Sequence, residues 1–178
     1  MLLINLAGIR KSFGASAEFT LREHLATWEV AGETVEFTQP VEVEVRATNL
    51  ANSLLLQGQI QTEVKLVCSR CLEPFNLAVT VNFAEELCHA ADLTSYMADH
   101  PEAQEEENYQ VFASDEFDIR PMVSEQIVLA LPMKPLCREE CEGLCPKCGC
   151  DWNKAKCACD LQQGDPRLAG LADFFNKE

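Results

Sequence analysis

PVEVEVRAT, residues 40–48, alternates apolar side chains with charged or polar ones. A period of two predicts a half-buried β-strand, because successive side chains of a strand point to opposite faces of the sheet. The apolar face of this strand would turn toward a core, and the charged face would turn toward solvent. The predicted inward-facing residues are Val41, Val43, Val45 and Ala47.

Two stretches farther along the chain repeat this alternation. They are LLLQGQIQTEVKLV, residues 54–67, and FNLAVTVNF, residues 75–83. TNLANS and CSRCLEP supply the turns before them. Since short connections join the successive strands, the pattern predicts an antiparallel β-meander. The predicted inward-facing residues are Leu54, Leu56, Ile60, Val64 and Leu66 in one strand, and Phe75, Leu77, Val79, Val81 and Phe83 in the next.

A helix is predicted after the strands. DEFDIRPMVSEQIVLALP, residues 115–132, has the pattern of a short strand that enters a helix. Pro121 suits a first helical turn, where its missing N–H leaves no bond unmade, and Pro132 ends the helix. The residues predicted to pack on the sheet are Met122, Ile127, Val128 and Leu131.

The expected fold class is therefore α+β: an antiparallel β-meander packed with one or two helices, followed by a cysteine-rich zinc-knuckle segment. We expect a β-rich domain over residues 1–135, the cysteine-rich segment over 136–160 and a tail containing DPRLAGL over 161–178. Near the N-terminus, AEFTLREHLATWEV (residues 17–30) is ambiguous, and it could hold a helix.

Acidic residues outnumber basic ones by 29 to 14, which gives a net charge of −15. Such a surface repels phosphate, so direct binding of naked RNA is not expected and a basic protein is the favoured partner. A solvated, mobile acidic loop is predicted over about residues 89–110, with a frayed acidic helix as the alternative. Its candidate partner-binding residues are Glu105, Glu106 and Glu107.

Cysteines are concentrated toward the C-terminus, where CEGLCPKCGC spans residues 141–150. CPKC followed by Gly149 has the form of a zinc knuckle, a tight turn that directs two thiolates at one ion. Tetrahedral zinc needs four ligands, so one pair of cysteines needs another pair. Four close pairs are available: Cys68 with Cys71, Cys137 with Cys141, Cys145 with Cys148, and Cys157 with Cys159.

Joining nearest neighbours gives two structural Zn²⁺ sites. The pairs 145/148 and 157/159 combine across a short loop into one site. The pairs 68/71 and 137/141 combine into the other. The first two pairs would then pin the turn of the sheet to the end of the helix. An alternative has one site, with the remaining cysteines free. The ligand sets are Cys145, Cys148, Cys157 and Cys159 with Cys68, Cys71, Cys137 and Cys141 for two sites, or Cys137, Cys141, Cys145 and Cys148 for one.

Disulfides and redox chemistry are alternative uses of the thiols. The start, MLLINLAGIRKS, lacks basic residues ahead of its short apolar run, so it predicts no signal peptide and a cytoplasmic protein with reduced thiols. Disulfides would compete if the protein were exported, and CSRC could serve a dithiol redox role. Cys88 fits a small core residue, and Cys150 a spare thiol or an alternative ligand.

The sequence offers little for catalysis. It lacks a Gly-rich phosphate loop, a G-x-S-x-G motif and a His–Glu protease motif. An all-thiolate zinc site leaves no coordination position open for water, so it would be structural. We therefore expect a protein that is not an enzyme.

Three stretches together resemble the YceD-like proteins, the large ribosomal RNA subunit accumulation proteins. They are VKLVCSRCLEPF, ALPMKPLCREECEGLCPKCGCDWN and DPRLAGLADF, in this order and spacing. The resemblance implies a bacterial, cytosolic, non-enzymatic factor that supports accumulation or processing of large-subunit (23S) ribosomal RNA. It carries over these positions as metal ligands: Cys68, Cys71, Cys137, Cys141, Cys145 and Cys148.

The resemblance also suggests partners. In this family the gene often neighbours that for ribosomal protein L32, a small basic protein, which gives the acidic surface a candidate partner beside the pre-50S particle. The alternative function is a zinc- or redox-responsive thiol regulator, in which paired thiolates release metal on oxidation. A zinc-ribbon binder of nucleic acid would need a basic stripe, and REECEGLCPKCGCDWNKAK has too few basic residues for one.

Overall fold

The computed structural model describes residues 2–30, 32–99 and 109–159. The chain forms two compact units. The sheet unit comprises Met1–Leu66 and Phe75–Pro135, and the cysteine unit comprises Val67–Pro74 and Leu136–Glu178. The expected boundary after residue 135 kept the turn with Cys68 and Cys71 in the first domain. The structure groups this turn with the C-terminal segment, because its two thiols lie among those of Cys137 and Cys141.

Strands dominate the described residues, with two helices in the second half of the sheet unit. The elements in chain order are β1 (Leu3–Asn5), β2 (Ser16–Glu23), β3 (Trp28–Val30), β4 (Glu33–Phe37), β5 (Val41–Asn49), β6 (Leu54–Val67), β7 (Pro74–His89), α1 (Leu93–Asp99), β8 (Tyr109–Phe112), β9 (Glu116–Asp118) and α2 (Arg120–Ala130).

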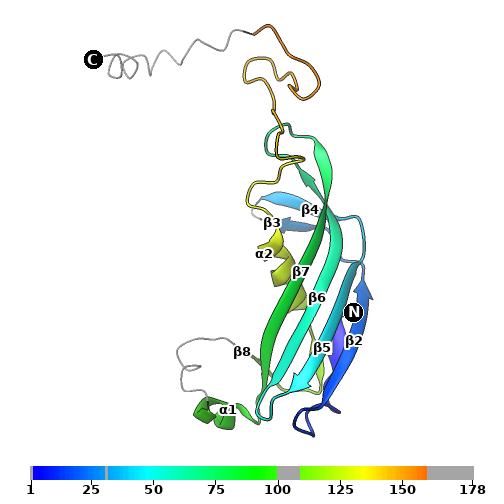
Figure 1. The fold of residues 1–178 in the computed structure, drawn as a ribbon, viewed down its shortest axis with the longest axis vertical. Coiled ribbons are helices and arrows are strands. Elements are labelled where there is room, and N and C mark those ends of the chain that lie inside the picture. Colours follow the sequence, from blue (N-terminus) through cyan, green and yellow to red (C-terminus); the bar gives the residue numbers. More distant parts are fainter. Residues whose placement is uncertain (1, 31, 100–108, 160–178) are drawn as a thin grey trace, which may run out of the picture. The chain divides into compact units, whose positions relative to one another are not determined.

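The long strands β5, β6 and β7 lie side by side in this order, as the predicted meander requires (Figure 1). β5 pairs antiparallel with β6 through registers such as Val43↔Ile60. β4 continues along the same edge of β6, where Phe37 pairs with Val64. β7 pairs with β8 in parallel, through registers such as Cys88↔Val111. The fold is α+β with a mainly antiparallel sheet, as predicted.

The stretch that could hold a helix, residues 17–30, instead contributes strands β2 and β3. β2 pairs antiparallel with β5 over its whole length. Its alternation explains the outcome: Ala17, Phe19 and Leu21 are half-buried and pack against the core, whereas the residues between them are exposed. A strand pattern of period two prevails here, so the structure resolves the ambiguity of this stretch in favour of strands.

The core of the sheet unit lies between the apolar face of the sheet and α2. Val41, Val43, Val45 and Ala47 are all at most 3% exposed, so the face predicted for this strand is confirmed. The helix contributes its buried side chains to the same cluster, and these are Met122, Val123 and Ile127. Val128 was predicted on this stripe but is 36% exposed, because Val123 occupies the sheet-facing position.

Gly58 lies on β6 at a point where the backbone of β5 comes close. It pairs with Val45, and a Cβ atom at this position would lie 2.1 Å from the carbonyl oxygen of Glu44. The ring of Phe83 also closes in, at 3.0 Å from the same point. Glycine therefore permits a strand approach that any side chain would block.

Part of the expected acidic loop is helical. α1 occupies residues 93–99, because Tyr96 is buried at 3% exposure and anchors it beside Cys88 and Tyr109. Glu105, Glu106 and Glu107 lie outside the described residues, as does the tail over 161–178. Among the described residues, no helix has the length and apolarity that crossing a membrane requires.

Candidate metal centres

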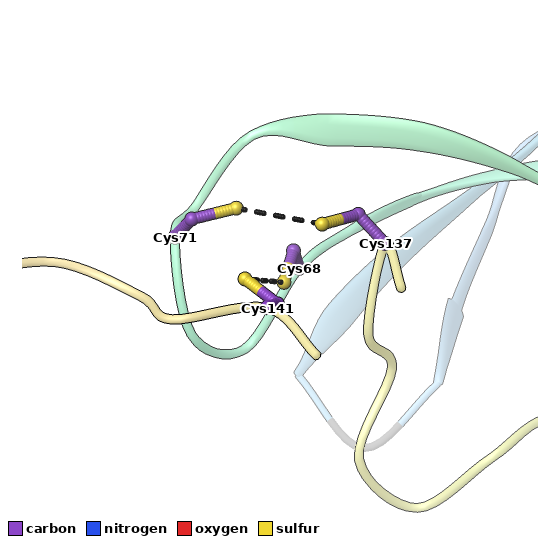
Figure 2. Close-up of side chains that lie close together, drawn as sticks. All are labelled: Cys68, Cys71, Cys137 and Cys141. Atoms are coloured by element: carbon purple, nitrogen blue, oxygen red, sulfur yellow. Dashed lines mark hydrogen bonds between the residues drawn. The ribbon is translucent and has the colours of Figure 1, made fainter. Parts of the chain in front are cut away.

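Four cysteines from two distant segments meet in the first cluster, which comprises Cys68, Cys71, Cys137 and Cys141. Their sulfur atoms point toward one another from the β6–β7 turn and from the segment after α2 (Figure 2). The four Sγ atoms all lie within 4.8 Å of one another. Sγ of Cys68 is 3.8 Å from Sγ of Cys141, and Sγ of Cys71 is 3.8 Å from Sγ of Cys137.

The second cluster comprises Cys145, Cys148, Cys157 and Cys159, and its four Sγ atoms also lie within 4.8 Å of one another. The alternative of one site shared by Cys137, Cys141, Cys145 and Cys148 does not match this grouping. The structure therefore assembles the four pairs in the nearest-neighbour arrangement.

These separations fit a tetrahedral metal. A Zn–S bond of about 2.3 Å sets an S···S edge of about 3.8 Å in a regular tetrahedron. A disulfide would need its sulfurs at about 2.05 Å, and all ten cysteines are free thiols. Four thiolates are a donor set typical of zinc or iron–sulfur sites. Two sites that could each hold one metal ion are thus present.

The two C-x-x-C turns have the same backbone geometry, although only one carries a glycine after its second cysteine. Leu72 N–H donates to the Cys68 carbonyl at 2.9 Å, and Gly149 N–H donates to the Cys145 carbonyl at 2.8 Å. The residue in this place has a positive φ in both turns, 60° at Leu72 and 71° at Gly149. CSRC therefore forms a second knuckle, although no glycine follows its second cysteine.

N–H donors surround one sulfur in each cluster. Burial raises the pKa of the Cys68 thiol, but hydrogen bonds from the backbone of Cys137, Cys71 and Arg70 outweigh it and lower the pKa to about 6. The indole Nε1–H of Trp152 donates to Cys157 Sγ at 3.5 Å and lowers the pKa of that thiol to about 6. Such donors stabilise the thiolate, the form that binds metal.

Another thiol in each cluster has a raised pKa. Burial and hydrogen bonding with Cys141 raise the pKa of Cys137 to about 12. Hydrogen bonding with Cys148, together with burial, raises the pKa of Cys159 to about 12. Thiols this close resist joint ionisation unless a cation balances them, and a divalent ion supplies that balance.

The cysteine unit has few other means of holding its shape. Among its described residues, the buried positions are Cys68, Cys71, Cys141, Gly143 and Cys145. Buried aliphatic or aromatic side chains are thus absent from this described part. Small modules without an apolar core depend on metals or disulfides for stability, so metal at both clusters would be structural.

The two remaining cysteines lie outside both clusters. Cys88 is fully buried in the sheet unit against Tyr96, as expected of a small core residue. Cys150 is partly exposed, and its Sγ lies 3.3 Å from the carbonyl oxygen of Ala155. Sequence reasoning missed Trp152 and Asn153, which donate to cluster sulfurs, because hydrogen bonds from side chains leave no spacing signal.

Comparisons with known proteins give the chain a family context. A family model described as "Large ribosomal RNA subunit accumulation protein YceD" matches residues 56–175. The uncharacterized protein YlbN of Bacillus subtilis is 30% identical over 140 residues, which cover 78% of this chain and 76% of that protein. No solved structure matches.

Relatives in other groups of organisms match as well. An uncharacterized protein of Mycobacterium tuberculosis is 26% identical over 138 residues, covering 78% of this chain and 63% of that protein. The chain thus spans less than two thirds of the length of this relative. A chloroplastic protein of Arabidopsis thaliana, named large ribosomal RNA subunit accumulation protein YCED homolog 1, is 26% identical over 155 residues, covering 76% of this chain and 48% of that protein.

Proposed function

The chain belongs to the YceD family of large ribosomal RNA subunit accumulation proteins, and we propose from this that it is a cytoplasmic, non-enzymatic ribosome biogenesis factor. It supports the accumulation or processing of large-subunit (23S) ribosomal RNA. The observation that carries the proposal is the family match over residues 56–175, which includes every cysteine of both clusters. Two chloroplastic relatives bear the name of this task.

Zinc is the metal proposed for both clusters. When bound, each ion would link chain segments through four bonds, and its positive charge would offset part of the negative charge of the four thiolates. Cys68 and Cys71 would hold the β6–β7 turn, and Cys137 and Cys141 the segment after α2. Because four thiolates fill the coordination sphere, no position remains for substrate, which supports a structural rather than catalytic role.

A basic protein is the proposed direct partner. The net charge of −15 favours a cationic surface and opposes naked RNA. Ribosomal protein L32 is one candidate, and a basic protein surface on the pre-50S particle is another. Association through charge would weaken as salt increases, because exposed charges are screened beyond about 8 Å at physiological ionic strength.

Depletion of the protein tests the proposal. The ratio of large- to small-subunit ribosomal RNA is measured together with gradient profiles of the subunits. We expect a selective loss of the large-subunit species, restored by the wild-type chain and by Cys88→Ser. The double variant Cys68→Ser/Cys145→Ser, which removes one thiol from each cluster, should restore it poorly. An unchanged ratio after depletion would contradict the proposed function.

The alternative, a thiol regulator, gives a different result with mild peroxide. A sensor ejects its zinc at low oxidant, because thiolate oxidation removes ligands. Structural sites retain their zinc under the same treatment. Metal release at low peroxide, combined with an unchanged RNA ratio, would favour the regulator.

A further inference from the structure

Two consecutive residues each reach a different cluster. The indole Nε1–H of Trp152 donates to Sγ of Cys157 in the second cluster at 3.5 Å. The side-chain Nδ2–H of Asn153 donates to Sγ of Cys141 in the first cluster at 3.4 Å. One short turn thus places a hydrogen-bond donor on a sulfur of each prospective metal centre.

The turn that holds these donors is fixed by Asp151. The Oδ1 atom of this residue accepts from the backbone N–H of Asn153 at 2.9 Å and from its Nδ2–H at 2.7 Å. The carbonyl oxygen of Asp151 accepts from the N–H groups of Lys154 and Ala155. These bonds tie the amide of Asn153 to the turn, so the donor cannot move independently of it.

The same turn is attached to the chain that joins the two clusters. Trp152 N–H donates to the carbonyl oxygen of Gly143 at 3.0 Å, and Leu144 forms a β-bridge with Asp151. Oδ1 of Asn153 accepts from the N–H of Glu142 at 2.9 Å. Residues 142–144 link the last ligand of the first cluster to the first ligand of the second, so the turn and this link form one connected structure.

We infer that Asp151, Trp152 and Asn153 couple the two clusters, so that the two metal ions bind cooperatively. The inference rests on the proposed function in one respect, namely that both clusters hold zinc. Hydrogen bonds from N–H groups favour the anionic metal-bound thiolates, and outer hydrogen-bond partners of this kind change metal affinity by about 10–100-fold. An ion in one cluster orders the turn and thereby positions the donor for the other.

Coupling of this kind is reciprocal, because each ion must change the affinity of the other by the same factor. Asn153 and Trp152 are positioning residues in this scheme, since they act through the sulfur atoms. If each donor acted only on its own site, its loss would weaken zinc binding at that site and leave the affinity of the other site unchanged. The coupling factor therefore separates the two explanations.

The test uses the full chain and zinc, with competition against a chromogenic chelator and metal content measured independently. Cys145→Ser/Cys148→Ser removes the second cluster, and Cys68→Ser/Cys71→Ser removes the first. We expect each double variant to bind one ion, with an affinity at least about 10-fold below that of the same site in the wild type. The factor by which the affinity falls should be the same for both sites.

The bridging residues are then changed singly. Asn153→Asp keeps the shape but places a carboxylate oxygen where the donor lies, and Trp152→Phe keeps a ring but removes the N–H. Each should weaken its own site by about 10–100-fold and reduce the coupling factor toward 1. Trp28→Phe in the sheet unit and Cys150→Ser are matched controls, which should leave both affinities unchanged.

The outcomes separate the inference from its premise. A wild-type chain that binds no zinc would contradict the proposed structural zinc. Two bound ions whose affinities do not change when the other cluster is removed would overturn the coupling and leave the zinc proposal intact. Unequal factors, or Asn153→Asp and Trp152→Phe variants with full coupling, would likewise overturn it. Strand protection in hydrogen exchange confirms that the sheet unit of each variant has folded, and protection over residues 137–157 reports on the cysteine unit.

Discussion

Sγ of Cys71 lies 3.8 Å from Sγ of Cys137, although 66 positions separate the two residues in the sequence. The contact closes a long loop of chain that contains β7, both helices and the strands between them. Closing a loop costs conformational entropy, and the cost increases with the length of the loop. A cross-link that closes a long loop therefore stabilises the folded chain more than one that closes a short loop. A metal ion bound by both residues would therefore stabilise the fold more than a link between neighbours.

Removal of metal should unfold the cysteine unit and spare the sheet. Zinc binding is worth about 10–16 kcal/mol in small zinc-dependent modules, and the described part of this unit buries only cysteines and a glycine. We expect a strong chelator to abolish hydrogen-exchange protection over residues 137–157, while β5 and β6 keep theirs. Unchanged protection over 137–157 in chelator would show that metal does not hold this segment.

Substitution of single cysteines should distinguish metal ligands from cysteines that do not bind metal. Cys68→Ser should lower bound zinc by one equivalent, because a serine hydroxyl is a poor replacement for a thiolate ligand. Cys88→Ser is the matched control, since Cys88 is equally buried but lies outside both clusters. Metal analysis of the purified variants measures the difference. Equal zinc in both variants would remove Cys68 from the ligand set.

The sequence predicts the parts of this fold that depend on local pattern. β5, β6 and β7 follow from an alternation of period two, and α2 follows from its two prolines and an apolar stripe. β2 is ambiguous from the sequence, because its apolar residues are only half-buried at the sheet edge. α1 depends on one buried tyrosine among acidic residues, which local pattern does not reveal.

The candidate site was predictable to a similar extent. Tetrahedral coordination requires four ligands, so the close pairs of cysteines limit the possible sets, and the structure realises the nearest-neighbour set. The donors Trp152 and Asn153 were not predictable, because their hydrogen bonds depend on how the turn at Asp151 folds back on Gly143. The parallel pairing of β7 with β8 likewise depends on contacts beyond the local sequence.

Adding a side chain at the positive-φ position of one knuckle and removing it from the other should have different effects on zinc affinity. Gly149→Ala adds a Cβ at a φ of 71°, where a side chain costs about 1–2 kcal/mol, so zinc affinity should fall by about 5–30-fold. Leu72 already bears this strain at a φ of 60° and is 63% exposed. Leu72→Gly should therefore leave affinity unchanged or improve it. Chelator competition measures both, and a loss in Leu72→Gly equal to that in Gly149→Ala would contradict the strain argument.

Alkaline pH should destabilise the region around α1. Burial and the nearby Glu86 carboxylate raise the pKa of Tyr96 from 10.0 to about 12. The unfolded chain loses this proton first, so the native state binds more protons between these values and stability falls as pH rises from 10 to 12. Hydrogen exchange of α1 against pH measures the fall. Tyr96→Phe should flatten it, and an equal slope in Tyr96→Phe and in the wild type would assign the fall to other groups.

Gly58→Ala should destabilise the sheet unit and leave the metal content unchanged. The added Cβ would meet the Glu44 carbonyl oxygen at 2.1 Å, so β5 and β6 must separate or shift register locally. Overpacking of a close contact costs about 1–3 kcal/mol and occasionally more, and a contact with backbone leaves little room for adjustment. Urea unfolding followed through the fluorescence of Trp28, with Trp152 replaced by Phe in both the variant and its reference, measures this loss.

Gly8→Ala is the matched control for that substitution, because a Cβ at Gly8 meets nothing within 4 Å. It should leave the unfolding midpoint of the sheet unit near the wild-type value. Both variants should retain the same number of bound zinc ions, since the ligands of both clusters belong to the cysteine unit. If Gly58→Ala released zinc at the same urea concentration that unfolds β5 and β6, the two units would unfold as one and the division between them would not be energetic.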